Sequence, residues 1–179
     1  PCLTAGKVDA VDFGFRAMMN LTADFAGIDR PARSREETEQ LLRILRTFGK
    51  AATLGQATGD RAAIRAEIQA ALDEFDRDYF TPSSGRRRAL IAEFEAGRVS
   101  EDDLPRDVLV ELLRHEDELG LTRDVLLKEI GFYLLAGAFT SIHTMTHALH
   151  EILGYIAAHP DEEARIRSDR LFIQRSVHE

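Results

Sequence analysis

Two residue types that support specialised structures are almost missing from this sequence of 179 residues, which contains one cysteine and no tryptophan. A single cysteine cannot close a disulfide within the chain, so a disulfide-stapled secreted scaffold is excluded and a reducing compartment, the cytoplasm, is favoured. The same count excludes a zinc or iron–sulfur site that takes four cysteines from one chain.

Positive charge is also in short supply, because 23 lysines and arginines face 31 aspartates and glutamates, for a net charge of -8 at pH 7. Proteins that bind nucleic acids by neutralising phosphates need the opposite balance, so we expect no nucleic-acid partner, although a small basic patch remains compatible. A hydrophobic share of 44% excludes wholesale disorder, and the length fits one domain with a real core.

Segments that enter or cross a membrane are not apparent in the sequence. Residues 1–14 lack the charged start and the continuous apolar run of a secretory signal peptide. The longest apolar run, from Ile130 to Ile142, spans about 13 residues, which suits a buried helix and is short for a bilayer. We therefore expect a soluble chain without a membrane segment.

Proline is rare as well, with five residues, and the hydrophobic pattern predicts a series of amphipathic helices without sustained strand-type alternation. Gly27 is a candidate cap for the end of the first helix, and Ser34 with Glu37 forms a capping-box pattern at the start of the second. The helices expected before residue 120 are 11–25, 34 to the glycine at 55, 61–80, 89–96 and 107–119.

Two local interpretations concern the region after residue 80. The run from Pro82 to Gly85 predicts a break between helices, because proline, serine and glycine favour turns. The arginines 86–88 that follow are interpreted as a solvated helix start, balanced by Glu93 and Glu95.

The dominant predicted element is one very long helix. From Thr122, a candidate N-cap, to His159, which precedes Pro160, no residue stops a helix. At 1.5 Å per residue this helix, about 123–158, is roughly 54 Å long and crosses a domain from side to side. Apolar residues recur along it at steps of three or four: Leu127, Ile130, Leu134, Ala138, Ile142, Met145, Leu149, Ile152 and Ile156.

Small residues interrupt the middle of this helix. Gly137 costs about 1 kcal/mol relative to alanine inside a helix and therefore needs a reason. Two reasons are possible: the glycine allows another helix to pack closely, or it makes room for a flat ligand. Thr140 lies one turn after Ala136, so its hydroxyl either bonds the Ala136 carbonyl or opens the helix locally and serves a ligand.

This segment, Ala136-Gly137-Ala138-Phe139-Thr140-Ser141, resembles the oxygen-binding helix of the cytochrome P-450 heme-thiolate monooxygenases, whose motif reads Ala/Gly-Gly-x-Asp/Glu-Thr-Thr/Ser. Its surroundings resemble the same family from about Val11 to Glu179. The similar segments are Phe15–Ile28, Asp102-Asp103-Leu104, Leu109–Leu113, Ala148–Leu153, His159-Pro160-Asp161-Glu162 and Gln174–Glu179, the last like the approach to Glu-x-x-Arg.

The resemblance implies an all-α fold, an orthogonal multi-helix array around one central helix, of which residues 1–179 form the central part. It implies a heme cofactor beside Ala136, Gly137 and Thr140, with Thr140 as the catalytic residue that hydrogen-bonds the bound oxygen and supplies protons. The reaction would oxidise a small organic substrate with dioxygen, using electrons from a partner such as a ferredoxin or a flavoprotein reductase.

The same resemblance implies that helices 37–52 and 61–80 form a mobile roof over the substrate. Phe132, Leu135 and Phe139 of the long helix would line an apolar pocket and bind the substrate. Cys2 matches no family position, so we expect the axial cysteine outside this chain and little activity from the chain alone. Apolar surface left exposed on the long helix would then favour association with other chains or other parts of the polypeptide.

The sequence departs from the family motif at Phe139, where an acid usually stands. A phenyl ring cannot relay a proton. Three consequences remain open: protons arrive through water and Ser141 or His143, the acid is dispensable for this substrate, or the chemistry differs from ordinary hydroxylation. Altered proton delivery with retained heme chemistry is our hypothesis.

Two rival interpretations rest on other features. His143, His147 and Glu151 recur every four residues, a spacing that can hold zinc but equally suits a plain surface, and we assign no metal ligand. An all-helical ligand-binding regulator without catalysis has this length and helix content, but residues 1–50 show no basic helix-turn-helix.

Overall fold

The computed structural model describes residues 6, 9–169, 171 and 174, and within these residues it contains helices and no strand. The predicted all-α class is therefore confirmed, while Cys2 and most of 170–179 lie outside the described residues. The α-helices are α1 (Ala10–Ala26), α2 (Arg35–Ala52), α3 (Arg61–Phe75), α4 (Thr81–Glu95), α5 (Val108–Arg114), α6 (Glu116–Leu119), α7 (Arg123–Ala158) and α8 (Glu163–Ser168); the short η elements are η2 (Leu54–Gln56), η3 (Asp76–Phe80), η4 (Glu101–Asp103) and η5 (Pro160–Glu162).

Three predicted helix ends coincide with capping residues. Gly27 closes α1 in the left-handed conformation, with φ at 86°, and its N–H donates to Ala23 and Asp24 carbonyls. The Ser34 hydroxyl accepts from the Glu37 N–H at 3.2 Å, and the Thr122 hydroxyl accepts from the N–H three residues on at 3.3 Å. These local bonds satisfy donors that helix ends otherwise leave free.

The predicted break at Pro82–Gly85 is wrong. After α3 the chain forms one π-helical segment, η3, and continues directly into α4, with Pro82 in its first turn. Proline is tolerated there because a first-turn N–H has no helical partner to lose. Ser83 and Ser84 are buried, and the Ser83 hydroxyl accepts from the Asp29 N–H at 2.9 Å, so these serines serve packing.

The interpretation of the arginine cluster is wrong for Arg87 and for the acidic partners, while Arg86 and Arg88 are exposed as expected. Arg87 is buried, and its guanidinium pairs with Asp107 at 2.8 Å and with Asp29 at 2.9 Å. Arg86 shares Asp29, and Arg88 pairs with Glu116, so Glu93 and Glu95 are not the partners. This cluster ties the α1–α2 loop, α4 and the start of α5 together. The predicted helix 107–119 is interrupted at His115, which separates α5 from α6.

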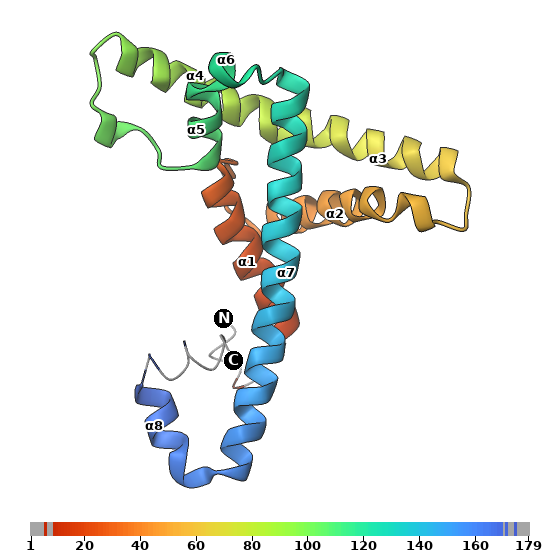
Figure 1. Cartoon of the computed structure of the whole chain (residues 1–179), viewed down its shortest axis with the longest axis vertical. Helices are drawn as coiled ribbons and strands as arrows, with labels where there is room; N and C mark the ends of the chain where they lie inside the picture. The colour runs from red at the N-terminus through yellow and green to blue at the C-terminus, as the bar shows by residue number, and fades with distance from the viewer. Residues whose placement is uncertain (1–5, 7–8, 170, 172–173, 175–179) are drawn as a thin grey trace.

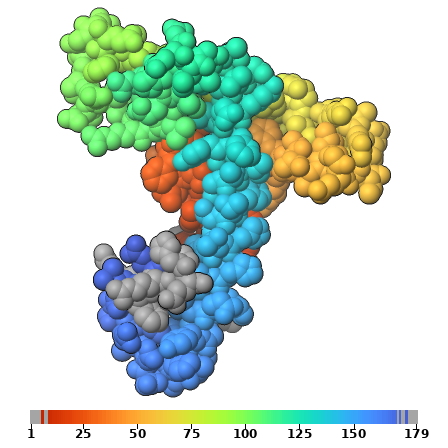
Figure 2. Space-filling model, viewed as in Figure 1, coloured from red at the N-terminus to blue at the C-terminus, as the bar shows by residue number. Residues whose placement is uncertain are grey.

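The long helix α7 is confirmed with 36 residues and forms the axis of the fold. It packs against α1 and α2, which cross behind it and beside it in Figure 1. Its buried residues lie between Leu126 and Ile142. Beyond that point the apolar stripe reaches solvent: Leu149 is 39% exposed and Leu153 is 55% exposed, as the extended lower half in Figure 2 illustrates.

The pair α2 and α3 projects from the other side of α7 as a helical hairpin (Figure 1). Phe48 of α2 anchors the hairpin, because its ring lies edge-on to Phe75 of α3 at 5.7 Å and also meets Gly131 of α7. A Cβ at Gly131 would lie 3.1 Å from the Phe48 ring, so the absent side chain allows this approach. Aromatic packing therefore joins the hairpin to the central helix.

Candidate functional site

The middle of α7 is held by α1, which runs antiparallel to it. Gly14 of α1 approaches Met145, while Thr22, two turns further along α1, approaches Gly137. Residues later in α1 therefore contact residues earlier in α7, as expected for antiparallel helices. Met19, Ala23 and Ala26 of α1 are buried.

Gly137 lies directly against Thr22 of α1. A Cβ built on Gly137 would lie 2.7 Å from Cγ2 of Thr22, a separation that real side chains do not adopt. The missing side chain is thus explained by close packing, one of the two reasons that the sequence left open. Its predicted contact with a cofactor is not tested by this packing and stays a prediction.

Phe139 also belongs to the packed side of α7. Its ring lies edge-on to Phe15 of α1, with centroids 5.5 Å apart and planes at 73°, a favourable aromatic geometry. The guanidinium carbon of Arg46, from α2, lies 5.6 Å from the centroid of the same Phe15 ring. Phe139 therefore contributes to a contact that links α7, α1 and α2.

Phe132, Ala136, Thr140 and Thr144 follow one another at steps of four along α7, and we call this row of residues the open face. Thr140 and Thr144 are exposed and Ala136 is half-buried. The Thr140 hydroxyl donates to the Ala136 carbonyl at 2.6 Å, and α7 is helical throughout this region. Of the two alternatives that the sequence allows, the structure contains the hydrogen bond to the Ala136 carbonyl, and the helix does not open at Thr140.

A shallow apolar groove of about 590 Å³ runs beside Thr140, between α1 and the second half of α7. Thr144, one turn beyond Thr140, also lines this groove, and its hydroxyl donates to the Thr140 carbonyl at 3.1 Å. His143 is not among the lining residues. The groove is lined by Met18, Thr140, Ser141, Thr144, Met145, Ala148, Leu149 and Ile152.

The three predicted substrate-binding residues differ in exposure. Phe132 is 65% exposed and belongs to the open face. Leu135 is partly buried against the hydrophobic core, and Phe139 faces α1 as described above. Phe132 is therefore the member of this set that presents its side chain to solvent.

The first turn of α7 is fixed to the π-helical segment by an ion pair. Arg123 donates to Asp76 at 2.6 and 2.9 Å, and its guanidinium also lies 5.7 Å from the Phe80 ring centroid. The hydrogen bond from Arg123 lowers the pKa of Asp76 below its ordinary value, since it favours the charged carboxylate. This contact orients the start of the helix that carries the open face.

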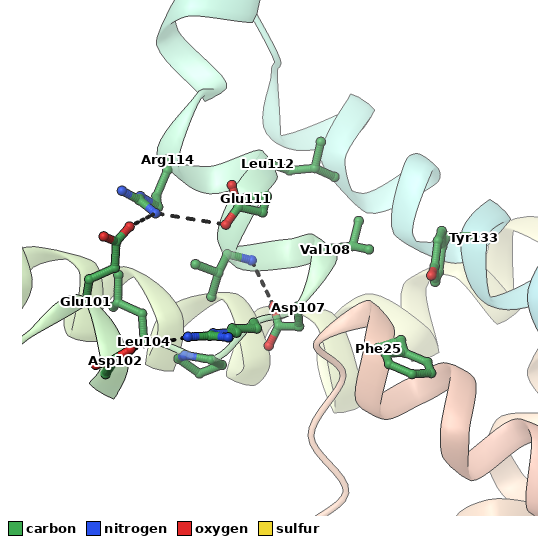
Figure 3. Close-up of a pocket in the computed structure, with 13 residues that line it drawn as sticks. Phe25, Glu101, Asp102, Leu104, Asp107, Val108, Glu111, Leu112, Arg114 and Tyr133 are labelled. Atoms are coloured by element: carbon green, nitrogen blue, oxygen red, sulfur yellow. Dashed lines mark hydrogen bonds and ion pairs between the residues drawn. The ribbon is translucent and has the colours of Figure 1, made fainter.

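A second cavity lies at the other end of α1, where Phe25 and Tyr133 face the α5 region (Figure 3). Its volume is about 650 Å³, and its rim carries the ion pair of Arg114 with Glu101 at 3.3 Å. Pairing between these rim charges is of the exposed kind that contributes little energy. The cavity is separate from the groove, with no lining residue in common.

The zinc-type spacing of the histidines does not produce a metal centre among the described residues, where no three ligating side chains gather. Among these residues α7 is also the one helix whose length and composition would suit a membrane span, and 39% of its most apolar window is buried inside the protein. A buried core helix has the same properties, so this is weak evidence for a membrane.

Sequence reasoning missed the residues that come from α1. Phe15, Met18 and Thr22 reach the site through tertiary packing, and no local pattern marks them. Thr144 had a signal, since it stands four residues after Thr140 and therefore on a neighbouring face of the helix. Comparison with protein-family models, curated proteins and solved structures finds no match to this chain.

Proposed function

We propose that this chain is the oxygen-side helical portion of a cytochrome P-450-type heme-thiolate monooxygenase, which oxidises a small organic substrate with dioxygen. In this proposal the finer architecture is the orthogonal helical array of that family, with α7 as its central helix. The observation that carries the proposal is the pair Ala136 and Thr140. The two residues stand one turn apart on the open face of the central helix and are joined by a hydrogen bond of 2.6 Å.

The residues of the open face fit a flat, largely apolar cofactor. Ala136 has a small side chain between Phe132 and Thr140, so a planar group can approach the helix there. Gly137 faces Thr22. In this proposal its role is to let α7 pack closely on α1, which leaves Ala136 and Thr140 free to face the cofactor. When bound, heme with a cysteine thiolate supplies the redox chemistry that reduces and cleaves dioxygen.

Thr140 is the residue that supplies a hydroxyl at this point. Its oxygen retains lone pairs while its hydrogen is donated to the Ala136 carbonyl, so it can accept a hydrogen bond from water. Because threonine in a helix has two accessible χ1 rotamers, the hydroxyl can turn from that carbonyl toward the open face. Thr140 then holds a proton at Oγ1 beside the cofactor.

Phe139 fits this proposal as a packing residue that has replaced an acid. Its edge-on contact with Phe15 directs the ring into the α1–α2 side, away from Thr140. Proton supply to Thr140 must therefore come from hydroxyl groups and water on the open face. Phe132 would contact the substrate, and electrons would come from a ferredoxin or a flavoprotein reductase.

The test is the reduced, carbon monoxide-treated difference spectrum of the full-length protein after heme binding. A thiolate-type band is the expected result, and its absence would remove the monooxygenase proposal. DNA binding in a gel shift at physiological salt, without that band, would favour the helical regulator instead. Product formation with the purified electron donor then identifies the substrate.

A further inference from the structure

We propose that the cavity at the end of α1 binds a small organic cation, a ligand with an apolar ring and a protonated amine. The volume of this cavity, about 650 Å³, lies within the range of pockets that hold small molecules. The cavity shares no lining residue with the open face, so binding there does not depend on the heme chemistry proposed above.

Two exposed aromatic rings form one wall of the cavity. Phe25 comes from the last turn of α1 and is 55% exposed, and Tyr133 comes from α7 and is 39% exposed. Within the part of the chain that the structure describes, neither ring stacks on another ring and the Tyr133 hydroxyl has no hydrogen-bond partner. The rings therefore offer a surface on which a flat apolar group can pack.

The opposite side of the cavity is charged. In Figure 3 the rings stand on one side, the Glu101–Arg114–Glu111 group stands on the other, and Val108 and Leu112 of α5 lie between them. An elongated ligand can thus place its ring against the aromatic wall and its polar end against the charged group. The apolar side chains of α5 would contact the part of the ligand between these ends.

The charged group carries an excess of negative charge. Arg114 lies 3.3 Å from Glu101 and 3.9 Å from Glu111, and its guanidinium is also held over the Phe94 ring, 5.5 Å from the centroid. Two carboxylates therefore share one guanidinium. His115 lies 4.0 Å from Glu111 and offsets its charge only when protonated. A cation is attracted to this group and an anion is repelled.

The other charged residues of the lining are balanced. Arg106 pairs with Asp102 at 3.2 Å, and Asp107 pairs at 2.8 Å with the buried Arg87. The excess charge therefore comes from the Glu101–Arg114–Glu111 group. Both of its carboxylates are exposed, and exposed ion pairs contribute little energy, so either carboxylate can turn to a ligand at small cost.

The experiment compares three probes that share a phenyl ring and a three-carbon chain: phenylpropylamine, phenylpropanol and phenylpropionate. Each is titrated into the full chain at millimolar concentration, and the methyl NMR signals of Val108 and Leu112 are followed. At about pH 8 an alkylammonium is charged and histidine is neutral. We expect the amine to bind about fivefold more tightly than the alcohol, and the carboxylate to bind most weakly.

Two pairs of variants separate the ring from the charge. Phe25→Leu should weaken amine and alcohol alike by about fivefold, because each loses an aromatic contact. Phe13→Leu is its control, since Phe13 is also on α1, is 48% exposed and does not line the cavity. Glu111→Gln should abolish the preference for the amine over the alcohol, while Glu118→Gln, an exposed acid outside the lining, should keep it.

Methyl signals that do not move with the amine would overturn the proposal, as would equal affinities for the three probes or a preference for phenylpropionate. It would also fall if Phe25→Leu behaved as Phe13→Leu. Signals that move with protein concentration and not with any probe would mean that a second copy of the chain fills the cavity. Because no readout involves heme, these outcomes are distinct from the presence or absence of the thiolate-type band.

Discussion

Two faces of one helix differ in what their small residues do. On the packed face, Gly137 lets α7 touch Thr22 of α1, where even one added carbon would collide. On the open face, its neighbour Ala136 leaves space beside an exposed threonine. Adjacent small residues thus have unrelated roles, and the sequence pattern alone does not separate them. The contact with α1 shows that Gly137 is the residue required for packing.

The largest expected effect on stability comes from filling the packed face. Gly137→Val places a branched side chain against Thr22 and should lower the free energy of unfolding by about 3 kcal/mol. Ala136→Val is the matched control, and its loss should be about 0.7 kcal/mol, close to the difference in helix propensity. Urea denaturation of both variants measures the difference. Equal losses would mean that the two faces are not distinct.

Placing an acid at position 139 tests the proposed role of Phe139. Phe139→Asp loses the contact with Phe15 and should cost about 2 kcal/mol of stability. In the heme-loaded full-length protein, Phe139→Asp should also raise coupling, the amount of product formed per electron pair, because a carboxyl group can relay protons. Phe139→Asn has a similar shape and no acid, so it should lose the same stability without the gain. Coupling that is identical in the two variants would argue against altered proton delivery.

A smaller effect is expected from the ion pair at the start of α7. Asp76 has a lowered pKa, so its pairing with Arg123 stabilises the fold above the ordinary aspartate pKa and is lost as pH falls through the lowered value. Asp76→Asn should lower stability at neutral pH by less than about 1 kcal/mol, as expected for a partly exposed pair. Its stability should then fall less steeply than wild type at acidic pH. Denaturation at several pH values measures this, and parallel curves would exclude the linkage.

The smallest change in stability is expected on the open face. Thr140→Val removes a hydroxyl that bonds only its own helix, so the free energy of unfolding should change by less than about 0.5 kcal/mol. Coupling in the heme-loaded protein should nevertheless fall, since the proposed proton holder is gone. If Thr140→Val loses stability but keeps its coupling, Thr140 is a structural residue and not the proposed proton holder.

Much of the fold was predictable because its signals are local. The start of α7 at Thr122 and its end before Pro160 follow from capping and from proline chemistry, and both are observed. The failures have non-local causes. Arg87 pairs with Asp107 and Asp29, which lie 20 and 58 residues away in the chain. Pro82 predicts a break between helices, but the π-helical segment before it places it in the first turn of α4, where proline is tolerated.

In the candidate site, too, the local features were predictable and the contacts between helices were not. Spacing along one helix placed Ala136 and Thr140 on a common face, and their hydrogen bond agrees with it. Spacing could not decide whether Gly137 or Phe139 joined them, because their orientation depends on Thr22 and Phe15 of another helix. Residues of α1 are therefore the part of the site that required the structure.

The most direct test of the central claim compares heme binding by the full-length wild-type protein and by Ala136→Phe, which fills the open face. The account predicts a thiolate-type band with carbon monoxide in the reduced wild-type protein. It predicts weak heme binding in Ala136→Phe with unfolding close to wild type. A wild-type protein without the band, or a variant that binds heme as well as wild type, would contradict the account.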